Sequence, residues 1–170
     1  IFAAAAATSP VATAAAAEAA TAPSSPQVTT AQVPAEKQTT LGLYVTAKEA
    51  YQRWEAAPDK VKIIDVRTPE EVFWVGHPPM AWKIPVVAVT YEWDADKKQF
   101  PMRPLPDFVT RVQKVAQPDD TLMVMCRSGG RGAMAVNLLA KAGYKNVYNV
   151  IDGMEGDSVE DSNSVFQGQR

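Results

Sequence analysis

Three short, almost wholly apolar runs constrain the fold of this chain more than any other feature of its sequence. They are VKIIDV at 61–66, TLMVM at 121–125 and VYNVI at 147–151. Strands that are apolar on both faces are typical of a parallel sheet that is covered by helices on both sides. Segments with helical patterns separate the runs, so we predict right-handed crossovers and a doubly wound α/β sheet flanked by helices.

The segments between the apolar runs carry clear helix signals. Thr46 and Glu49 have the spacing of a capping box, and apolar residues recur on one face of the helix that they start. Residues 107–116 also place apolar side chains at helical spacing. Residues 131–144 are rich in alanine and leucine, and Gly143 predicts where that helix stops.

The first 40 residues differ in composition from the rest of the chain. They are rich in Ala, Thr, Pro and Ser, and they hold too few large apolar side chains to repay the entropy of ordering. We therefore predict a disordered tail and linker over residues 1–40, a folded domain over 41–157 and a polar C-terminal tail over 158–170. This N-terminal extension also offers a tether to a membrane or to a larger complex.

Two interpretations of the alanine-rich start of the chain stay open. One is a weak helix or simple disorder. The other is the remnant of a signal peptide, because small residues typical of cleavage sites follow the opening Ile-Phe-Ala-Ala-Ala. The second interpretation predicts a periplasmic or cell-envelope location.

Charge and the supply of metal ligands exclude several functions. The net charge is -2 and no block of lysine or arginine stands out, so a nucleic-acid partner has no electrostatic footprint. The chain has one cysteine and one histidine. An intramolecular disulfide is therefore excluded, and we expect no protein-only zinc site.

The only cysteine, Cys126, directly follows an apolar run and precedes a predicted helix. Backbone N–H groups and the helix dipole at such a position favour the thiolate over the thiol, and we expect the sulfur to be reachable at the end of the strand. The next residues combine small size with positive charge, which suits an anionic substrate. The alternative is an inert, buried cysteine beside an ordinary glycine turn. The loop residues that would bind the substrate are Arg127, Ser128, Gly129, Gly130 and Arg131.

Four motifs in order resemble those of single-domain rhodaneses, the thiosulfate sulfurtransferase family. CRSGGR at 126–131 resembles the six-residue active-site loop, and IIDVRTPEEV at 63–72 is similar to the Asp-Val-Arg-x-Pro-x-Glu signature. GHPPMAWKIP at 76–85 is similar to the Gly-His-Ile-Pro-Gly-Ala motif. GYKNVYNVIDGMEG at 143–156 resembles the closing strand and its glycine turn. The resemblance implies a rhodanese-like fold over almost the whole predicted domain.

The resemblance also implies a chemistry. Cys126 would take sulfur from a small anionic donor such as thiosulfate, hold it as a persulfide and pass it to a thiol or cyanide without a metal or organic cofactor. Asp65 and Arg67 would support the wall of the site, although the residues alone also allow a solvated ion pair. His77, the sole histidine, is expected to fix a turn rather than to act as a base.

Two other functions stay open beside sulfur transfer. One is a non-catalytic rhodanese-like module that binds an anion or a protein. The other is a phosphatase or small-anion reductase on the same fold, but related phosphatases have a longer loop than the four residues between Cys126 and Arg131. Residues 86–108 exceed what a minimal domain needs, and they predict either a partner surface or a packed cover.

Overall fold

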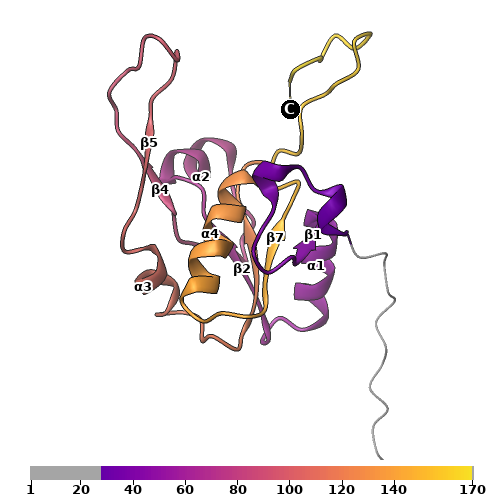
Figure 1. Ribbon diagram of the computed structural model, residues 1–170, viewed down its shortest axis with the longest axis vertical. Coiled ribbons are helices and arrows are strands. Elements are labelled where there is room, and N and C mark those ends of the chain that lie inside the picture. Colours follow the sequence, from indigo (N-terminus) through magenta and orange to yellow (C-terminus); the bar gives the residue numbers. More distant parts are fainter. Residues whose placement is uncertain (1–27, 170) are drawn as a thin grey trace, which may run out of the picture.

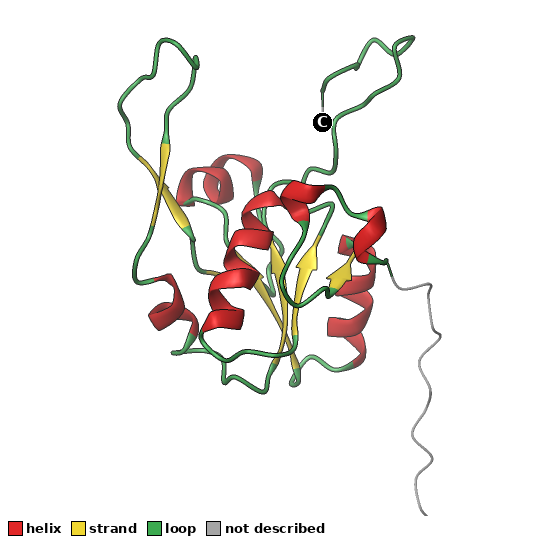
Figure 2. Cartoon of the chain, in the orientation of Figure 1, coloured by secondary structure: helices red, strands yellow, loops and turns green. Residues whose placement is uncertain are grey.

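Five parallel strands form the central sheet of the computed structural model, which describes residues 28–169. Their order is β1–β7–β6–β2–β3, and every neighbouring pair is parallel (Figures 1 and 2). Three of the strands coincide with the apolar runs, which confirms the predicted parallel α/β sheet. The strands are β1 (Tyr44–Val45), β2 (Val61–Asp65), β3 (Trp82–Lys83), β6 (Thr121–Met125) and β7 (Val147–Val150).

Helices pack on both faces of this sheet because alternate strand residues point to opposite sides. Ile63 and Met123 share one core cluster with α1 (Ala47–Ala56). Ile64 and Val124 share the other with α3 (Phe108–Val112) and α4 (Gly130–Lys141). A further helix, α2 (Pro69–Val75), follows β2 near the carboxyl edge of the sheet (Figure 1). The two-sided burial explains why the strand sequences are apolar throughout.

Local signals set most helix boundaries as predicted. Thr46 starts α1 with a complete capping box, in which its hydroxyl accepts a bond from Glu49 N at 3.2 Å and its N–H donates to Glu49 Oε2 at 2.8 Å. Gly143 has φ +95° just beyond α4. Helix α3 is shorter than the predicted pattern. Beyond Val112, the N–H groups of Lys114 and Val115 bond carbonyls three residues earlier, and the chain then approaches Pro118.

A two-stranded antiparallel hairpin stands outside the central sheet. Its strands are β4 (Val87–Val89) and β5 (Met102–Pro104), and its tip extends away from the body of the domain (Figure 1). Trp93 and Phe100 pack edge to face with ring centroids 5.2 Å apart, yet they remain 57% and 49% exposed. The predicted alternative of a packed cover is therefore wrong for the tip of this hairpin.

The N-terminal boundary of the folded unit lies earlier than predicted. Residues 30–37 form two short 3₁₀ helices, η1 (Thr30–Gln32) and η2 (Ala35–Lys37). Val33 and Lys37 are only 3% and 6% exposed. Asn149 of β7 donates a hydrogen bond to the carbonyl of Lys37 at 2.9 Å. The boundary at 41 was wrong because one valine and one lysine stem are buried within a segment of otherwise tail-like composition.

Further predictions concern the first residues of the chain and its C-terminal tail. The disorder and the signal-peptide remnant predicted for the start fall on residues 1–27, outside the described residues. At the other end, residues 158–169 turn back on themselves, with hydrogen bonds between Val159 and both Gly168 and Gln169. Within residues 28–169 no helix combines the length and the apolar character needed to cross a bilayer.

We expect residues 28–40 to stabilise the domain. A chain that starts at residue 41 loses the burial of Val33 and the backbone partner of Asn149, so its free energy of unfolding should fall by about 2 kcal/mol or more. The matched control is a chain that starts at residue 28. Urea unfolding of the two chains measures the difference, and equal midpoints would contradict the packing described here.

Candidate functional site

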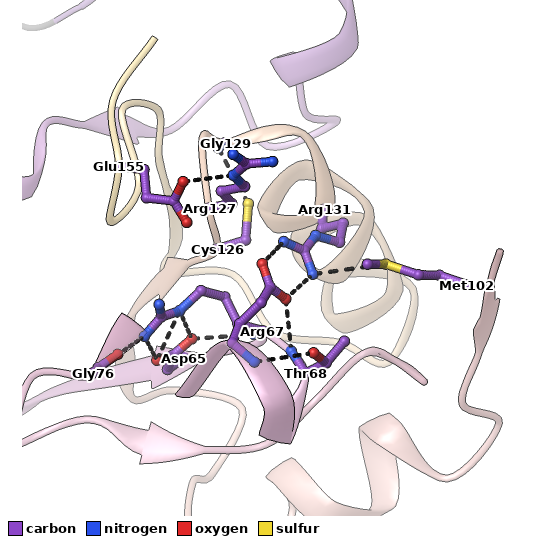
Figure 3. A network of polar contacts seen from close by, with 11 residues as sticks. Asp65, Arg67, Thr68, Gly76, Met102, Cys126, Arg127, Gly129, Arg131 and Glu155 are labelled. Carbon is purple, nitrogen blue, oxygen red and sulfur yellow. Dashed lines mark hydrogen bonds and ion pairs between the residues drawn. The ribbon is translucent and has the colours of Figure 1, made fainter. Parts of the chain in front are cut away.

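Cys126 lies at the carboxyl end of β6, in the connection that leads to α4 (Figure 3). Its Sγ accepts a hydrogen bond from the N–H of Gly129 at 3.2 Å. Within residues 28–169 this amide is the only hydrogen-bond partner of the sulfur, so the predicted nest of amides is represented by one donor. Cys126 is also only 1% exposed. The expectation of a reachable sulfur is therefore wrong for this conformation.

The loop at residues 126–131 is closed in by the glycine turn that follows β7. The carbonyls of Cys126 and Arg127 accept hydrogen bonds from Met154 N and Glu155 N, each at 2.9 Å. Gly153 has φ +59°, and a Cβ atom there would lie 2.5 Å from the carbonyl oxygen of Cys126. Only glycine combines that backbone conformation with so close an approach. The glycine turn thus fixes the backbone on which the sulfur is carried.

A second set of contacts reaches the loop from β7 and from the N-terminal segment. The side chain of Asn149 is fully buried and donates to the carbonyls of Gly129 and Lys37, at 3.1 and 2.9 Å. The ammonium group of Lys37 bonds the carbonyl of Ile151 at 3.0 Å and pairs with Asp157. Residues that precede the predicted domain boundary therefore help to hold the loop.

Arg131, at the end of the loop, forms a bidentate ion pair with Glu71 of α2. Both nitrogen–oxygen distances are 2.6 Å, and the side chains are 20% and 17% exposed. Burial raises the pKa of Glu71, but hydrogen bonds from Arg131 and Thr68 outweigh it and hold that pKa below its ordinary value. Burial lowers the pKa of Arg131, but the hydrogen bonds and charge of Glu71 raise it by more, and Cys126 adds to this increase. The pKa of Arg131 is therefore above its ordinary value. Arg131 is thus electrostatically coupled to the sulfur while its charge is balanced.

Arg127 also pairs with a carboxylate, but this arginine is more exposed than Arg131. Its Nε donates to Glu155 Oε2 at 2.7 Å, and the two side chains are 51% and 21% exposed. Sequence reasoning missed both carboxylates as partners of the loop arginines. The sequence places Glu71 at a helix start, through the Thr68-x-x-Glu71 capping box, but this signal does not indicate an arginine partner, and no local signal indicates Glu155.

Asp65 and Arg67 form a completely buried ion pair, so the alternative of a solvated pair is excluded. Both side chains are 0% exposed, and the Nη2–Oδ2 distance is 2.7 Å. Arg67 also donates to the carbonyl of Gly76 at 2.8 Å. Burial lowers the pKa of Arg67, but Asp65 more than compensates and raises it. The pair links the end of β2 to the turn that begins at Gly76.

The other predicted site residues make fewer contacts. Ser128 and Gly130 are half-buried parts of the loop. His77 is exposed, and its Nδ1 lies 3.2 Å from the carbonyl oxygen of Pro78. Its ring makes no hydrogen bond to Cys126. Among the described residues no group of three or more His, Cys, Asp or Glu side chains is placed to hold a metal ion.

Comparison with known proteins agrees with this arrangement of strand, cysteine loop and helix. The family model described as the rhodanese-like domain matches residues 46–159. The chain belongs to the rhodanese-like family.

Relatives of this rhodanese-like chain include one named sulfurtransferase and several uncharacterized proteins. Thiosulfate sulfurtransferase 16, chloroplastic, of Arabidopsis thaliana is 33% identical over 92 residues, which cover 54% of this chain and 69% of the relative. The uncharacterized protein RP600 of Rickettsia prowazekii is 32% identical over 96 residues, covering 56% and 71%. The solution structure of a rhodanese-like domain from Anabaena is 19% identical, with a TM-score of 0.49 and coverage of 72% and 83%.

Asp65 should stabilise this rhodanese-like domain by balancing a buried guanidinium. Asp65→Asn leaves the charge of Arg67 without a partner, so we expect the free energy of unfolding to fall by about 3–5 kcal/mol. The double variant Asp65→Asn/Arg67→Met should recover part of that loss, because an apolar chain of similar length needs no counter-charge. Denaturant unfolding of the variants tests this, and strictly additive losses would contradict it.

The contribution of Glu71 to stability should depend on pH. Its pKa is lower in the folded than in the unfolded state, so the stabilisation is present above the unfolded value of about 4.3 and is lost as the pH falls through the folded value. We expect the stability difference between the native chain and Glu71→Gln to be constant near neutral pH and to shrink below about pH 4. Urea unfolding over a pH series measures it. A difference that grows on acidification would be incompatible with this ion pair.

Proposed function

We propose that the protein is a sulfurtransferase that carries sulfane sulfur as a persulfide on Cys126. The observation that carries the proposal is the position of Cys126, directly after β6 and 3.2 Å from the Gly129 amide, within a loop that ends at Arg131. Membership of the rhodanese-like family supports the same reading. The name of the Arabidopsis relative supports thiosulfate as the donor class.

The proposed reaction has two nucleophilic steps. The thiolate of Cys126 attacks the outer sulfur of thiosulfate, a new sulfur–sulfur bond forms, and the electron pair of the broken bond leaves with sulfite. An acceptor thiolate or cyanide then attacks the outer sulfur of the persulfide and restores the Cys126 thiolate. The Gly129 amide stabilises the negative charge on Sγ before the first step and after the second.

Access to the sulfur requires a local opening, since Cys126 is 1% exposed. The pair between Arg127 and Glu155 is the easier one to separate, because Arg127 is 51% exposed and exposed ion pairs contribute about 1 kcal/mol or less. Arg127 then serves as the cation that meets the anionic donor. Arg131 donates two hydrogen bonds to Glu71, so it keeps its position and fixes the end of the loop.

A non-catalytic rhodanese-like binding module is the second candidate. The closed sulfur is the observation that favours it, because an enzyme must expose its nucleophile to its donor. In this version the loop and its arginines recognise an anion or a protein, and the N-terminal extension tethers the module to a membrane or to a larger complex. A periplasmic or cell-envelope location is proposed for either candidate, and it rests on the composition at the start of the chain.

Sulfur loading separates the two candidates. After incubation with thiosulfate and removal of the excess, the intact mass of the folded chain should increase by one sulfur atom. Cys126→Ser should show no increase while its unfolding midpoint stays close to that of the native chain, because a hydroxyl is a poor nucleophile at neutral pH. A native chain that gains no sulfur, although its cysteine is alkylated readily in urea, would favour the binding module.

Arg127 should act on the donor through its charge. Arg127→Ala should raise KM for thiosulfate several-fold and change the use of an uncharged sulfane-sulfur donor much less. Arg111→Ala is the matched control, since Arg111 is 44% exposed and pairs with Asp107 on α3, away from the loop. Steady-state kinetics at low and high salt measures the effect. Equal losses with charged and neutral donors would show that Arg127 acts through the fold of the loop instead.

A further inference from the structure

A cavity of about 600 Å³ lies between α2 and the segment from Gly76 to Pro85. Among the described residues, none of the loop at 126–131 contributes to its walls. Its volume is in the range of pockets that bind small organic molecules, roughly 300–1,000 Å³. The cavity therefore does not include the cysteine loop, and it is large enough to bind a small molecule of its own.

The polar groups that line this cavity favour a negative charge. They come from Arg67, His77 and Lys83, and no aspartate or glutamate is among the lining residues. Lys83 makes no ion pair within residues 28–169, so its charge is not balanced by a neighbour. Arg67 is balanced by Asp65, but its Nη1 is buried without a hydrogen-bond partner. A ligand with an anionic group would supply the charge that the lining lacks.

The other walls are apolar. Val72 and Phe73 of α2 line one side and Pro85 contributes to the other. Phe73 is 77% exposed, which is unusual for a phenylalanine on a helix of a folded domain. An apolar or aromatic ligand against Phe73 would remove part of that ring from water.

We propose that this cavity is a second binding site, for small organic anions in which a carboxylate or sulfonate is joined to an apolar or aromatic body. The anionic group lies toward Lys83, and the apolar body packs against Phe73 and Val72. The site shares Arg67 with the surroundings of Cys126, but none of its lining residues belongs to the cysteine loop itself. Its occupancy can therefore be measured whether or not the chain forms a persulfide.

The test uses the full chain and two probes of nearly equal shape, 3-phenylpropionate and 3-phenyl-1-propanol. Amide chemical shifts recorded by NMR during each titration report both the site and the affinity. We expect the largest shifts within residues 72–83 and an affinity for the acid at least about tenfold higher than for the alcohol. Lys83→Met should reduce the affinity for the acid to that for the alcohol. Phe73→Ala should weaken both.

Two control variants and one control ligand keep the test specific. Lys62→Met removes a lysine that pairs with Asp120 outside the cavity, and Phe166→Ala removes a 61% exposed phenylalanine near the C-terminus that does not line it. Both should bind the acid as the native chain does. Equal affinity for acid and alcohol, or the largest shifts at residues 126–131, would overturn the proposal. So would inorganic sulfate that binds the same residues as tightly as the acid, since the apolar wall would then contribute nothing.

Discussion

The pairing of β2 with β6 is the constraint on which the rest of the site depends. Their parallel register places Asp65 beside Met125, and the ladder continues one step further, with Val66 N donating to the carbonyl of Met125 at 2.9 Å. Both strands end at the same edge of the sheet as a result. Everything that follows β2, including Arg67 and the start of α2, is thereby brought next to Cys126, although about 60 residues separate them in sequence.

Three arginine–carboxylate pairs then surround the cysteine in a graded series. The Asp65–Arg67 pair is wholly buried, Arg131–Glu71 is about one-fifth exposed, and Arg127–Glu155 has an arginine that is half exposed. Burial makes an ion pair harder to separate, because each separated charge would stay out of water. The inner pair is therefore structural, the middle pair sets the end of the loop, and the outer pair is the one that can exchange its carboxylate for a substrate anion. A site lined by arginines can thus be nearly neutral until a ligand arrives.

Local patterns in the sequence were enough to predict the three central strands of the sheet, the start of α1 and the position of Cys126 between strand and helix. The burial of Cys126 could not be predicted in this way, since it arises where the glycine turn, Asn149 and Lys37 meet around one loop. The same holds for Glu155, which reaches Arg127 because Gly153 lets its own turn approach the loop closely. The folded state of residues 30–37 escaped notice because composition reports the average of a segment, whereas two side chains anchor this one.

The anchoring of Lys37 has a mechanical consequence. Its carbonyl and the carbonyl of Gly129 accept hydrogen bonds from the same amide group of Asn149, and its ammonium group bonds the carbonyl of Ile151. A pulling force applied to the chain ahead of residue 28 would therefore be borne first by contacts that touch the cysteine loop, before it reached the hydrogen bonds of the sheet. Tension on the N-terminal end would thus reach the cysteine loop through the buried side-chain amide of Asn149.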